Sequence, residues 1–145
     1  MHILACFQIQ VKFSRTKTTP GLVVKVNLTD FTRVSAITTS GNNLASALEK
    51  GDFAYFGSDF FPGSVVKVNL TDFTEADVLP LEDNEGSLFS AVLSGQFAYF
   101  GCSTTPGIIV KVNLTDFTRV ENLTLNSDEN TLQTAVSKDD FAYFG

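Results

Sequence analysis

The stretch Val-Lys-Val-Asn-Leu-Thr-Asp-Phe-Thr occurs at residues 24–32 and returns without change at 66–74 and 110–118. Each copy lies a few residues after a Pro-Gly pair, and Pro20, Pro62 and Pro106 set a spacing of 42 and then 44 residues. A fixed period of this length is typical of chains that repeat one supersecondary unit. The sequence therefore predicts a tandem repeat protein.

A second motif, Phe-Ala-Tyr-Phe-Gly, recurs at 53–57, 97–101 and 141–145, and a polar or glycine-containing turn precedes each copy. Short apolar stretches flank these turns, which indicates β-hairpins. Each repeat is thus expected to supply four short strands, here called A to D. Strand A is expected at 44–48, 88–93 and 132–136; strand B at each Phe-Ala-Tyr-Phe; strand C at 23–28 and its copies; and strand D at 33–38, 75–81 and 119–125.

Strand B is apolar on both faces, with Phe53 and Tyr55 on one side and Ala54 and Phe56 on the other. A strand of this kind needs a packed sheet on each side, as between the blades of a β-propeller. The expected fold is all-β, a propeller segment of four-stranded antiparallel blades. The expected divisions are a degraded first half-blade and three repeats, all of one propeller domain: 1–19, 20–61, 62–105 and 106–145.

The degraded half-blade is aligned with Ala5 and Cys6 in strand A and Phe13 in strand B. The chain then holds about three to three and a half blades, whereas closed propellers have roughly four to eight. The ring is therefore expected to be incomplete unless the protein is oligomeric. The chain is either a fragment of a longer repeat protein or a protomer of a homo-oligomer that closes the ring, and two chains would supply about seven blades.

The motifs Pro-Gly-x-Val-Val-Lys-Val-Asn-Leu-Thr-Asp-Phe-Thr and Phe-Ala-Tyr-Phe-Gly resemble the WD-repeat-like and YVTN-type β-propeller repeats, which often occur in long strings within large proteins. The resemblance covers nearly everything after residue 20. It implies a propeller fold. It says little about activity, because such propellers serve mostly as binding platforms and only sometimes as enzymes.

The net charge of −6 and the pI near 4.6 argue against a nucleic-acid partner, since phosphate binding depends on clustered Lys and Arg. The N-terminus lacks the basic region of a signal peptide, and no apolar run is long enough to span a membrane. The compartment stays open, with an extracellular location as one alternative if the chain is a fragment of a longer surface protein. Cys6 and Cys102 show no metal-ligand spacing and no disulfide framework.

The D-to-A and B-to-C loops are expected on one face of the disc, and they differ between copies whereas the strands hardly do. Variable loops on a fixed frame favour recognition of a protein or glycan ligand. Phe60 and Phe61, beside Asp59, are the best candidates for an exposed contact; the alternative is that they cover the neighbouring loop. The other candidate binding residues, besides Asp59, are the loop carboxylates Glu82, Asp83, Glu85, Asp128 and Glu129. They are either solvated or suited to Ca²⁺, but they show no EF-hand pattern and no metal site is predicted.

Four Asn-Leu-Thr sequons could accept N-glycans in a secreted eukaryotic protein: Asn27, Asn69, Asn113 and Asn122. Three of them are copies of one motif. Their other interpretation is that the Asn side chain closes a turn by a hydrogen bond to the backbone, and this interpretation is favoured.

The sequence offers no catalytic residue and no cofactor motif. His2 is the only histidine, and near-identical repeats supply copies of one group rather than a set of acid, base and nucleophile. The leading hypothesis is a non-enzymatic binding or scaffold module. The alternatives are a fragment of an enzymatic propeller, a lyase or hydrolase with its active site in missing blades, and a structural self-assembly module.

Overall fold

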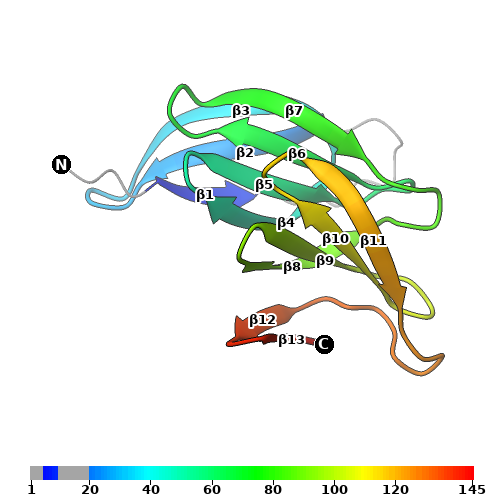
Figure 1. The fold of residues 1–145 in the computed structure, drawn as a ribbon. Helices are drawn as coiled ribbons and strands as arrows, with labels where there is room; N and C mark the ends of the chain where they lie inside the picture. The colour runs from blue at the N-terminus through cyan, green and yellow to red at the C-terminus, as the bar shows by residue number, and fades with distance from the viewer. Residues whose placement is uncertain (1–4, 10–19) are drawn as a thin grey trace.

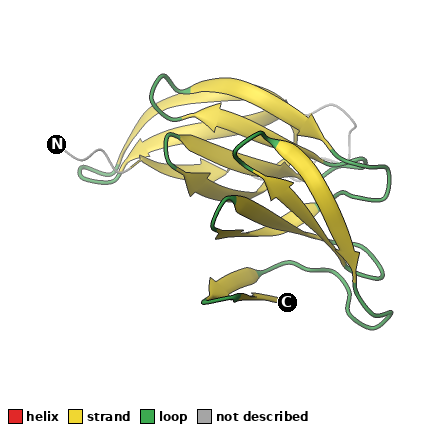
Figure 2. Cartoon of the chain, in the orientation of Figure 1, coloured by secondary structure: helices red, strands yellow, loops and turns green. Residues whose placement is uncertain are grey.

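A computed structural model describes residues 5–9 and 20–145, and these residues form only strands, turns and loops (Figure 1; Figure 2). The predicted all-β class is confirmed. The strands are β1 (Ala5–Ile9), β2 (Pro20–Asn27), β3 (Thr32–Asn42), β4 (Leu44–Lys50), β5 (Phe53–Ser58), β6 (Ser64–Asn69), β7 (Thr74–Pro80), β8 (Leu88–Ser94), β9 (Phe97–Cys102), β10 (Ile108–Asn113), β11 (Thr118–Thr124), β12 (Ala135–Lys138) and β13 (Phe141–Phe144).

The strands form successive antiparallel sheets that follow chain order. Blade I contains β1–β2–β3, blade II contains β4–β5–β6–β7, blade III contains β8–β9–β10–β11, and half-blade IV contains β12–β13. This is the open, incomplete propeller-like array of four-stranded blades that the repeats predicted. A sequence repeat that starts at Pro-Gly therefore spans two blades. It begins with strand C of one blade and ends with Phe-Ala-Tyr-Phe-Gly, which is strand B of the next blade.

The first strand differs from its predicted alignment. Ala5 was expected in strand A, but β1 pairs directly with β2 and sets Ala5 opposite Asn27. Phe53 and Asn69 face each other in the same way in blade II, so β1 takes the position of strand B. A short segment with alternating apolar residues suits either strand, and only its pairing with β2 distinguishes them. Phe13, the other residue of that alignment, lies outside the described residues.

The repeated Asn-Leu-Thr-Asp-Phe-Thr is a turn closed by its own side chains. In blade II, the Asn69 Oδ1 accepts a hydrogen bond from the Thr71 amide at 2.8 Å, and the Thr74 hydroxyl donates to Asp72 Oδ1 at 2.6 Å. Both bonds recur in the other two copies. Phe73 has a φ of 56°, a left-handed conformation that its copies share. The bonds match the predicted turn role of the first three sequon asparagines.

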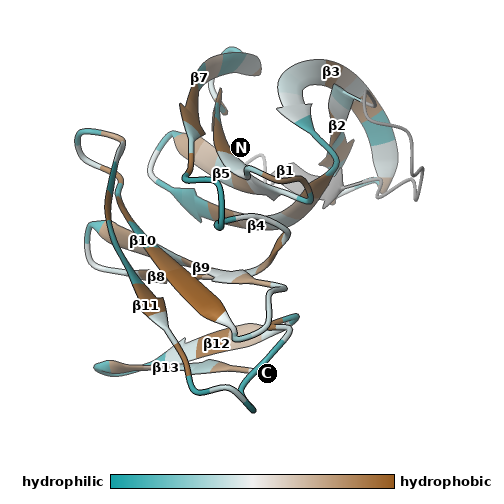
Figure 3. Cartoon of the chain, turned by 90° about the vertical axis from the view of Figure 1, so that its right-hand side faces the viewer, coloured by the Kyte–Doolittle hydropathy of each residue, from teal (hydrophilic) through white to brown (hydrophobic). Residues whose placement is uncertain are grey.

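The hydrophobic core lies between the blades, which Figure 3 shows as successive sheets with apolar strands and mainly polar turns. Each blade has an N-side face toward the preceding blade and a C-side face toward the following one. On the N-side face of blade III, Val110 and Val112 are fully buried against Tyr55 and Val65 on the C-side face of blade II. In blade II, Ala54 and Phe56 on the other face of strand B pack in a second cluster with Val23 of blade I, so this strand is covered on both sides, as its composition predicted.

Phe117, from the turn of blade III, inserts between two side chains of blade II. Its ring centroid lies 5.8 Å from that of Tyr55, and the Lys67 Nζ lies 5.4 Å from the Phe117 ring centroid. A cation at this distance is attracted to the aromatic ring. Blade II repeats the arrangement toward blade I, where Lys25 Nζ lies 5.7 Å from the Phe73 ring centroid.

Phe117 and Phe31 occupy the same turn with nearly the same φ, but Phe117 is 8% exposed and Phe31 is 84% exposed. Phe117→Ala should therefore lower the free energy of unfolding by roughly 3 to 5 kcal/mol through lost burial. Phe31→Ala should change it by less than about 0.5 kcal/mol in dilute solution. Urea unfolding of both variants measures the difference. Because the backbone strain is shared, equal losses would refute the assignment of this energy to packing between blades.

Candidate functional site

The loops that differ between the copies lie together on one face. The Gly63 amide donates to the Glu85 carbonyl at 2.6 Å, and the Ser87 amide donates to the Phe60 carbonyl at 3.1 Å. These bonds join the B-to-C loop of blade II to the D-to-A loop that leads into blade III. One blade further, the Gly107 amide donates to the Glu129 carbonyl at 2.7 Å in the same way. We call this surface the loop face.

The aromatic pair is divided between packing and exposure. Phe60 is half-buried, whereas Phe61 is 46% exposed. The Phe61 ring lies across Gly86, where an added Cβ would stand 2.7 Å from Phe61 Cδ1. Asp59 is half-buried, and its amide donates to the Asn43 carbonyl. Both interpretations of the pair therefore apply in part, because Phe61 covers the neighbouring loop and still presents much of its ring to solvent.

The acidic loop residues separate into two environments. Glu82 and Asp83 are exposed near Phe61, and Asp128 and Glu129 are exposed in the equivalent loop one blade further. Glu85 differs from the expected solvated carboxylate because it is 0% exposed. Among the described residues, no three His, Cys, Asp or Glu side chains gather closely enough to hold a metal ion.

The buried carboxylate of Glu85 is held by strand β11 of the next blade. Arg119 donates from Nε to Oε2 at 2.8 Å and from Nη2 to Oε1 at 2.5 Å, and the Asn122 Nδ2 donates to Oε1 at 2.6 Å. The Glu82 amide donates at 3.2 Å. Burial by itself raises the pKa of a carboxyl group, but these hydrogen bonds and the Arg119 charge outweigh it and lower the pKa of Glu85.

A β-bulge brings Arg119 and Asn122 to the same face of β11. The register against β10 shifts between Lys111 and Val112, so that Arg119 pairs with Val112 and Asn122 pairs with Val110. Both side chains therefore point toward blade II with the two buried valines. Bulges redirect side chains in this way.

At the interface between blades I and II, other residues occupy the positions of Glu85 and Arg119. Glu75 holds the register position of Arg119 and accepts hydrogen bonds from the Ser40 amide and hydroxyl at 2.7 and 2.6 Å. Gly41 holds the position of Glu85, where a Cβ would come within 2.2 Å of Val66 Cγ2. Sequence analysis missed the Glu85–Arg119 pair. A signal was present in the sequence, because both positions change together between copies. Gly41 and Glu75 at one interface are replaced by Glu85 and Arg119 at the next.

Asn122 is a structural residue of this network. Its Nδ2, the atom that carries an N-glycan, donates to the buried Glu85 carboxylate. The unmodified Asn122 side chain thus joins two blades, and a glycan at Nδ2 would have to fit beside the buried Glu85 carboxylate. The sequons at Asn27, Asn69 and Asn113 engage only their Oδ1 in the turn bonds, and their glycosylation stays a prediction.

Cys102 is a buried free thiol beneath the loop face. Burial raises the pKa of Cys102 to about 12, and the nearby Glu85 charge contributes to the rise. The thiolate is the nucleophilic form of cysteine. Cys102 is therefore protonated and unreactive at neutral pH.

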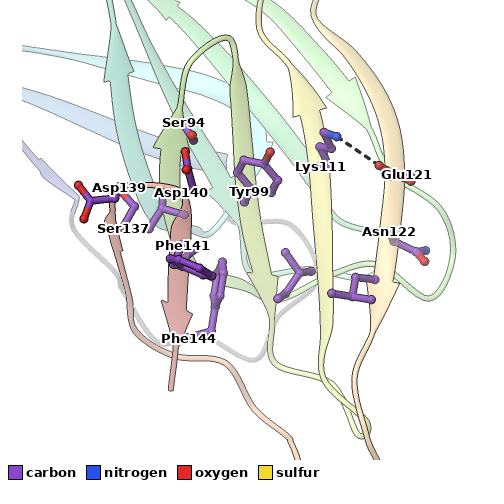
Figure 4. Close-up of a pocket in the computed structure, with 14 residues that line it drawn as sticks. Ser94, Tyr99, Lys111, Glu121, Asn122, Ser137, Asp139, Asp140, Phe141 and Phe144 are labelled. Carbon is purple, nitrogen blue, oxygen red and sulfur yellow. Dashed lines mark hydrogen bonds and ion pairs between the residues drawn. The ribbon is translucent and has the colours of Figure 1, made fainter.

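An open pocket of about 480 Å³ lies away from these loops, between blade III and half-blade IV (Figure 4). Tyr99 and Lys111 stand on one side, and Phe141 and Phe144 of β13 stand on the other. Lys111 pairs with Glu121 at 3.2 Å. The pocket walls thus combine aromatic rings with charged groups.

No protein-family model matches the chain, and no curated protein matches it. Among the solved structures that share its fold, the following three have low identity. Hydrazine synthase of Kuenenia stuttgartiensis is 15% identical with a TM-score of 0.61, over 79% of this chain and 32% of that one. The computationally designed Ika8 protein is 10% identical with a TM-score of 0.61, over 86% and 36%. Apo AztD from Citrobacter koseri is 12% identical with a TM-score of 0.59, over 77% and 31%.

The hydrazine synthase and AztD structures are propeller-type folds with antiparallel four-stranded sheets. The present chain spans about a third of the length of each matched structure. The similarity therefore establishes the propeller-type architecture and nothing about activity. None of the described residues belongs to a helix that is long and apolar enough to cross a membrane.

Glu85→Gln should lower the free energy of unfolding by about 2 kcal/mol at pH 7. This is less than the roughly 3 to 5 kcal/mol typical of removing one partner from a fully buried pair, because Arg119 keeps Glu82 and some solvent. Glu82→Gln, the control, removes an exposed partner of the same Arg119 and should cost less than about 1 kcal/mol. Chemical unfolding measures both variants.

The difference between wild type and Glu85→Gln should depend on pH. Because the folded pKa of Glu85 is lowered, the charged carboxylate contributes its full stability above the ordinary pKa of about 4.3 and loses it as the pH falls through the folded pKa. A difference that stays constant down to pH 2 would contradict an ionised Glu85.

Cys102 should resist thiol reagents in the folded protein. In a Cys6→Ser background, Ellman's reagent at pH 8 should titrate one thiol only after denaturant is added, because the native thiol is buried and protonated. Rapid stoichiometric reaction without denaturant would show that the site opens.

Proposed function

We propose that this chain is a non-enzymatic binding module that uses a propeller-like frame to present the loop face to a protein or glycan. The observation that carries the proposal is the exposed Phe61 ring. The ring packs on the buried Gly86 of the neighbouring loop, and the loop residues around it change between copies. Aromatic residues, Phe included, are enriched at the centres of protein interfaces.

The charge around Phe61 indicates the chemistry of the ligand. Glu82 and Asp83 are exposed in the loop that Phe61 covers, and Asp59 precedes the aromatic pair. Arg119 neutralises only part of this charge, since it is already bound by the buried Glu85. A ligand that combines an apolar surface with basic or hydroxyl groups fits best, such as a basic peptide segment or a sugar ring.

The non-enzymatic part of the proposal is supported by the buried ionisable groups of the loop face. Glu85 is occupied by Arg119 and Asn122, and Cys102 is protonated at neutral pH. Neither group is poised for proton transfer or nucleophilic attack. Both serve the contact between blades II and III.

Replacing Phe60 and Phe61 together with Ala should abolish ligand capture without unfolding the chain. The probes are an array of short peptides rich in Lys and Arg and an array of glycans. The fluorescently labelled wild-type chain should give signals that the double variant loses by at least about tenfold, as expected for removing an aromatic contact. Circular dichroism should show an unchanged strand spectrum.

Val120→Ser is the matched control, because Val120 is an exposed apolar residue of β11 rather than a loop residue. It should leave the array signals unchanged. Capture that survives the loss of both aromatic residues would remove this site from consideration.

A further inference from the structure

Two repeat motifs lack their counterpart within the described chain. In blades II and III, the Phe-Ala-Tyr-Phe strand pairs with the Val-Lys-Val-Asn strand. The third Phe-Ala-Tyr-Phe, β13, pairs only with β12, and the first Val-Lys-Val-Asn, in β2, pairs with β1 instead. In β1, Gln8 holds the register position that the fully buried Phe56 and Phe100 hold elsewhere. β1 is therefore a poorer match to β2 than β13 would be.

The N-side face of blade I is exposed where its equivalents are buried. Phe31 is 84% exposed, whereas Phe117 of blade III is 8% exposed. Leu28 is 45% exposed, and its equivalent Leu114 is 5% exposed. The same residues in the same turn thus pack against a neighbouring blade in one case and face solvent in the other.

The C-side face of blade III carries the receiving residues. In blade II, Tyr55 and Lys67 hold Phe117. Their equivalents, Tyr99 and Lys111, line the open pocket of about 480 Å³. Figure 4 shows Tyr99 and Lys111 on one side of this space and Phe141 and Phe144 of β13 on the other.

Charge complements this shape. Glu129 is positioned like Glu85, since its Oε2 accepts the Asn126 amide at 2.9 Å as Glu85 accepts the Glu82 amide. Arg33 holds the register position of Arg119, opposite the second valine of the motif. Glu129 and Arg33 are both exposed. Within the described part of the chain, they are the unpaired equivalents of Glu85 and Arg119, whose ion pair joins blades II and III.

We propose that the occupant of this pocket is a second copy of the chain, whose blade I docks on the C-side face of blade III. Phe31 of one copy enters the pocket between Tyr99 and Lys111 of the other, and Arg33 meets Glu129. β13 takes the place of β1 beside β2, so that β12 and β13 of one copy and β2 and β3 of the other form one four-stranded blade.

The same contact closes a ring when it is made twice. Each copy contributes two complete blades and one shared blade, so two copies make six blades, within the roughly four to eight of closed propellers. The sequence predicted about seven blades because it counted the N-terminal segment as a separate half-blade. In the proposed dimer, β13 of the other copy fills the strand B position that β1 occupies, so this segment adds no half-blade. The contact is head-to-tail, the kind that forms rings when the rotation closes. This surface is separate from the loop face, so each can fail in experiment without the other.

Light scattering behind size exclusion, over a range of concentrations, tests the proposal on the full chain. Wild type should reach a limiting mass of twice the 15.7 kDa chain. Phe31→Ala should raise the dissociation constant by about ten- to a hundredfold, the value of one buried phenylalanine ring. Because Phe31 is exposed within its own copy, circular dichroism should show the variant folded. Val120→Ser, which alters an exposed apolar residue that does not line the pocket, should leave the dissociation constant unchanged.

A charge exchange identifies the interface itself. Arg33→Glu and Glu129→Arg should each weaken the dimer, and the double variant should restore it, because every interface then contains the pair in reversed order. A chain that stays monomeric at all concentrations would overturn the proposal. So would a dimer that tolerates Phe31→Ala, and so would masses that grow beyond two copies.

Discussion

The fold depends on the contact between the C-side face of one blade and the N-side face of the next. A four-stranded sheet with two apolar faces cannot bury both faces alone, so each repeat relies on its neighbours. Val110 and Val112 of blade III become fully buried only because Tyr55 and Val65 of blade II lie against them. The unchanged residues of the repeat include those that make this contact, with the valines and Phe117 on one side and Tyr55 on the other.

The lysine of the repeated motif illustrates how one residue serves two blades. Lys67 Nζ lies 4.2 Å from the ring centroid of Phe53 in its own blade and 5.4 Å from that of Phe117 in the next. A half-buried ammonium group is tolerated there because the aromatic rings attract it and its apolar stem packs between them. Replacement by an aliphatic residue would fill the space but lose this attraction.

Residues of the loop face either join two blades or face solvent, and the sequence does not distinguish the two roles. Glu85 stabilises the junction of blades II and III through Arg119, whereas its neighbours Glu82 and Asp83 remain in solvent. Phe61 likewise packs on Gly86 with one side of its ring and exposes the rest. The proposed binding surface is therefore rigid because it is part of the packing between blades. Its shape is fixed before a ligand arrives, which reduces the entropy lost on binding.

The sequence by itself determined the repeat, the four-strand unit, the side-chain-closed turn and the all-β class. These features follow from short-range patterns, namely the two-residue alternation of strands and the preferences of Asn, Asp and Gly for turns. Tertiary structure decided the rest, because it depends on residues that meet only when blades stack. Arg119 reaches Glu85 across 34 positions of sequence, and this contact makes a loop carboxylate a buried one. The place of β1 and the different exposures of Phe31 and Phe117 have the same origin, since identical motifs differ only in the neighbour that each one meets.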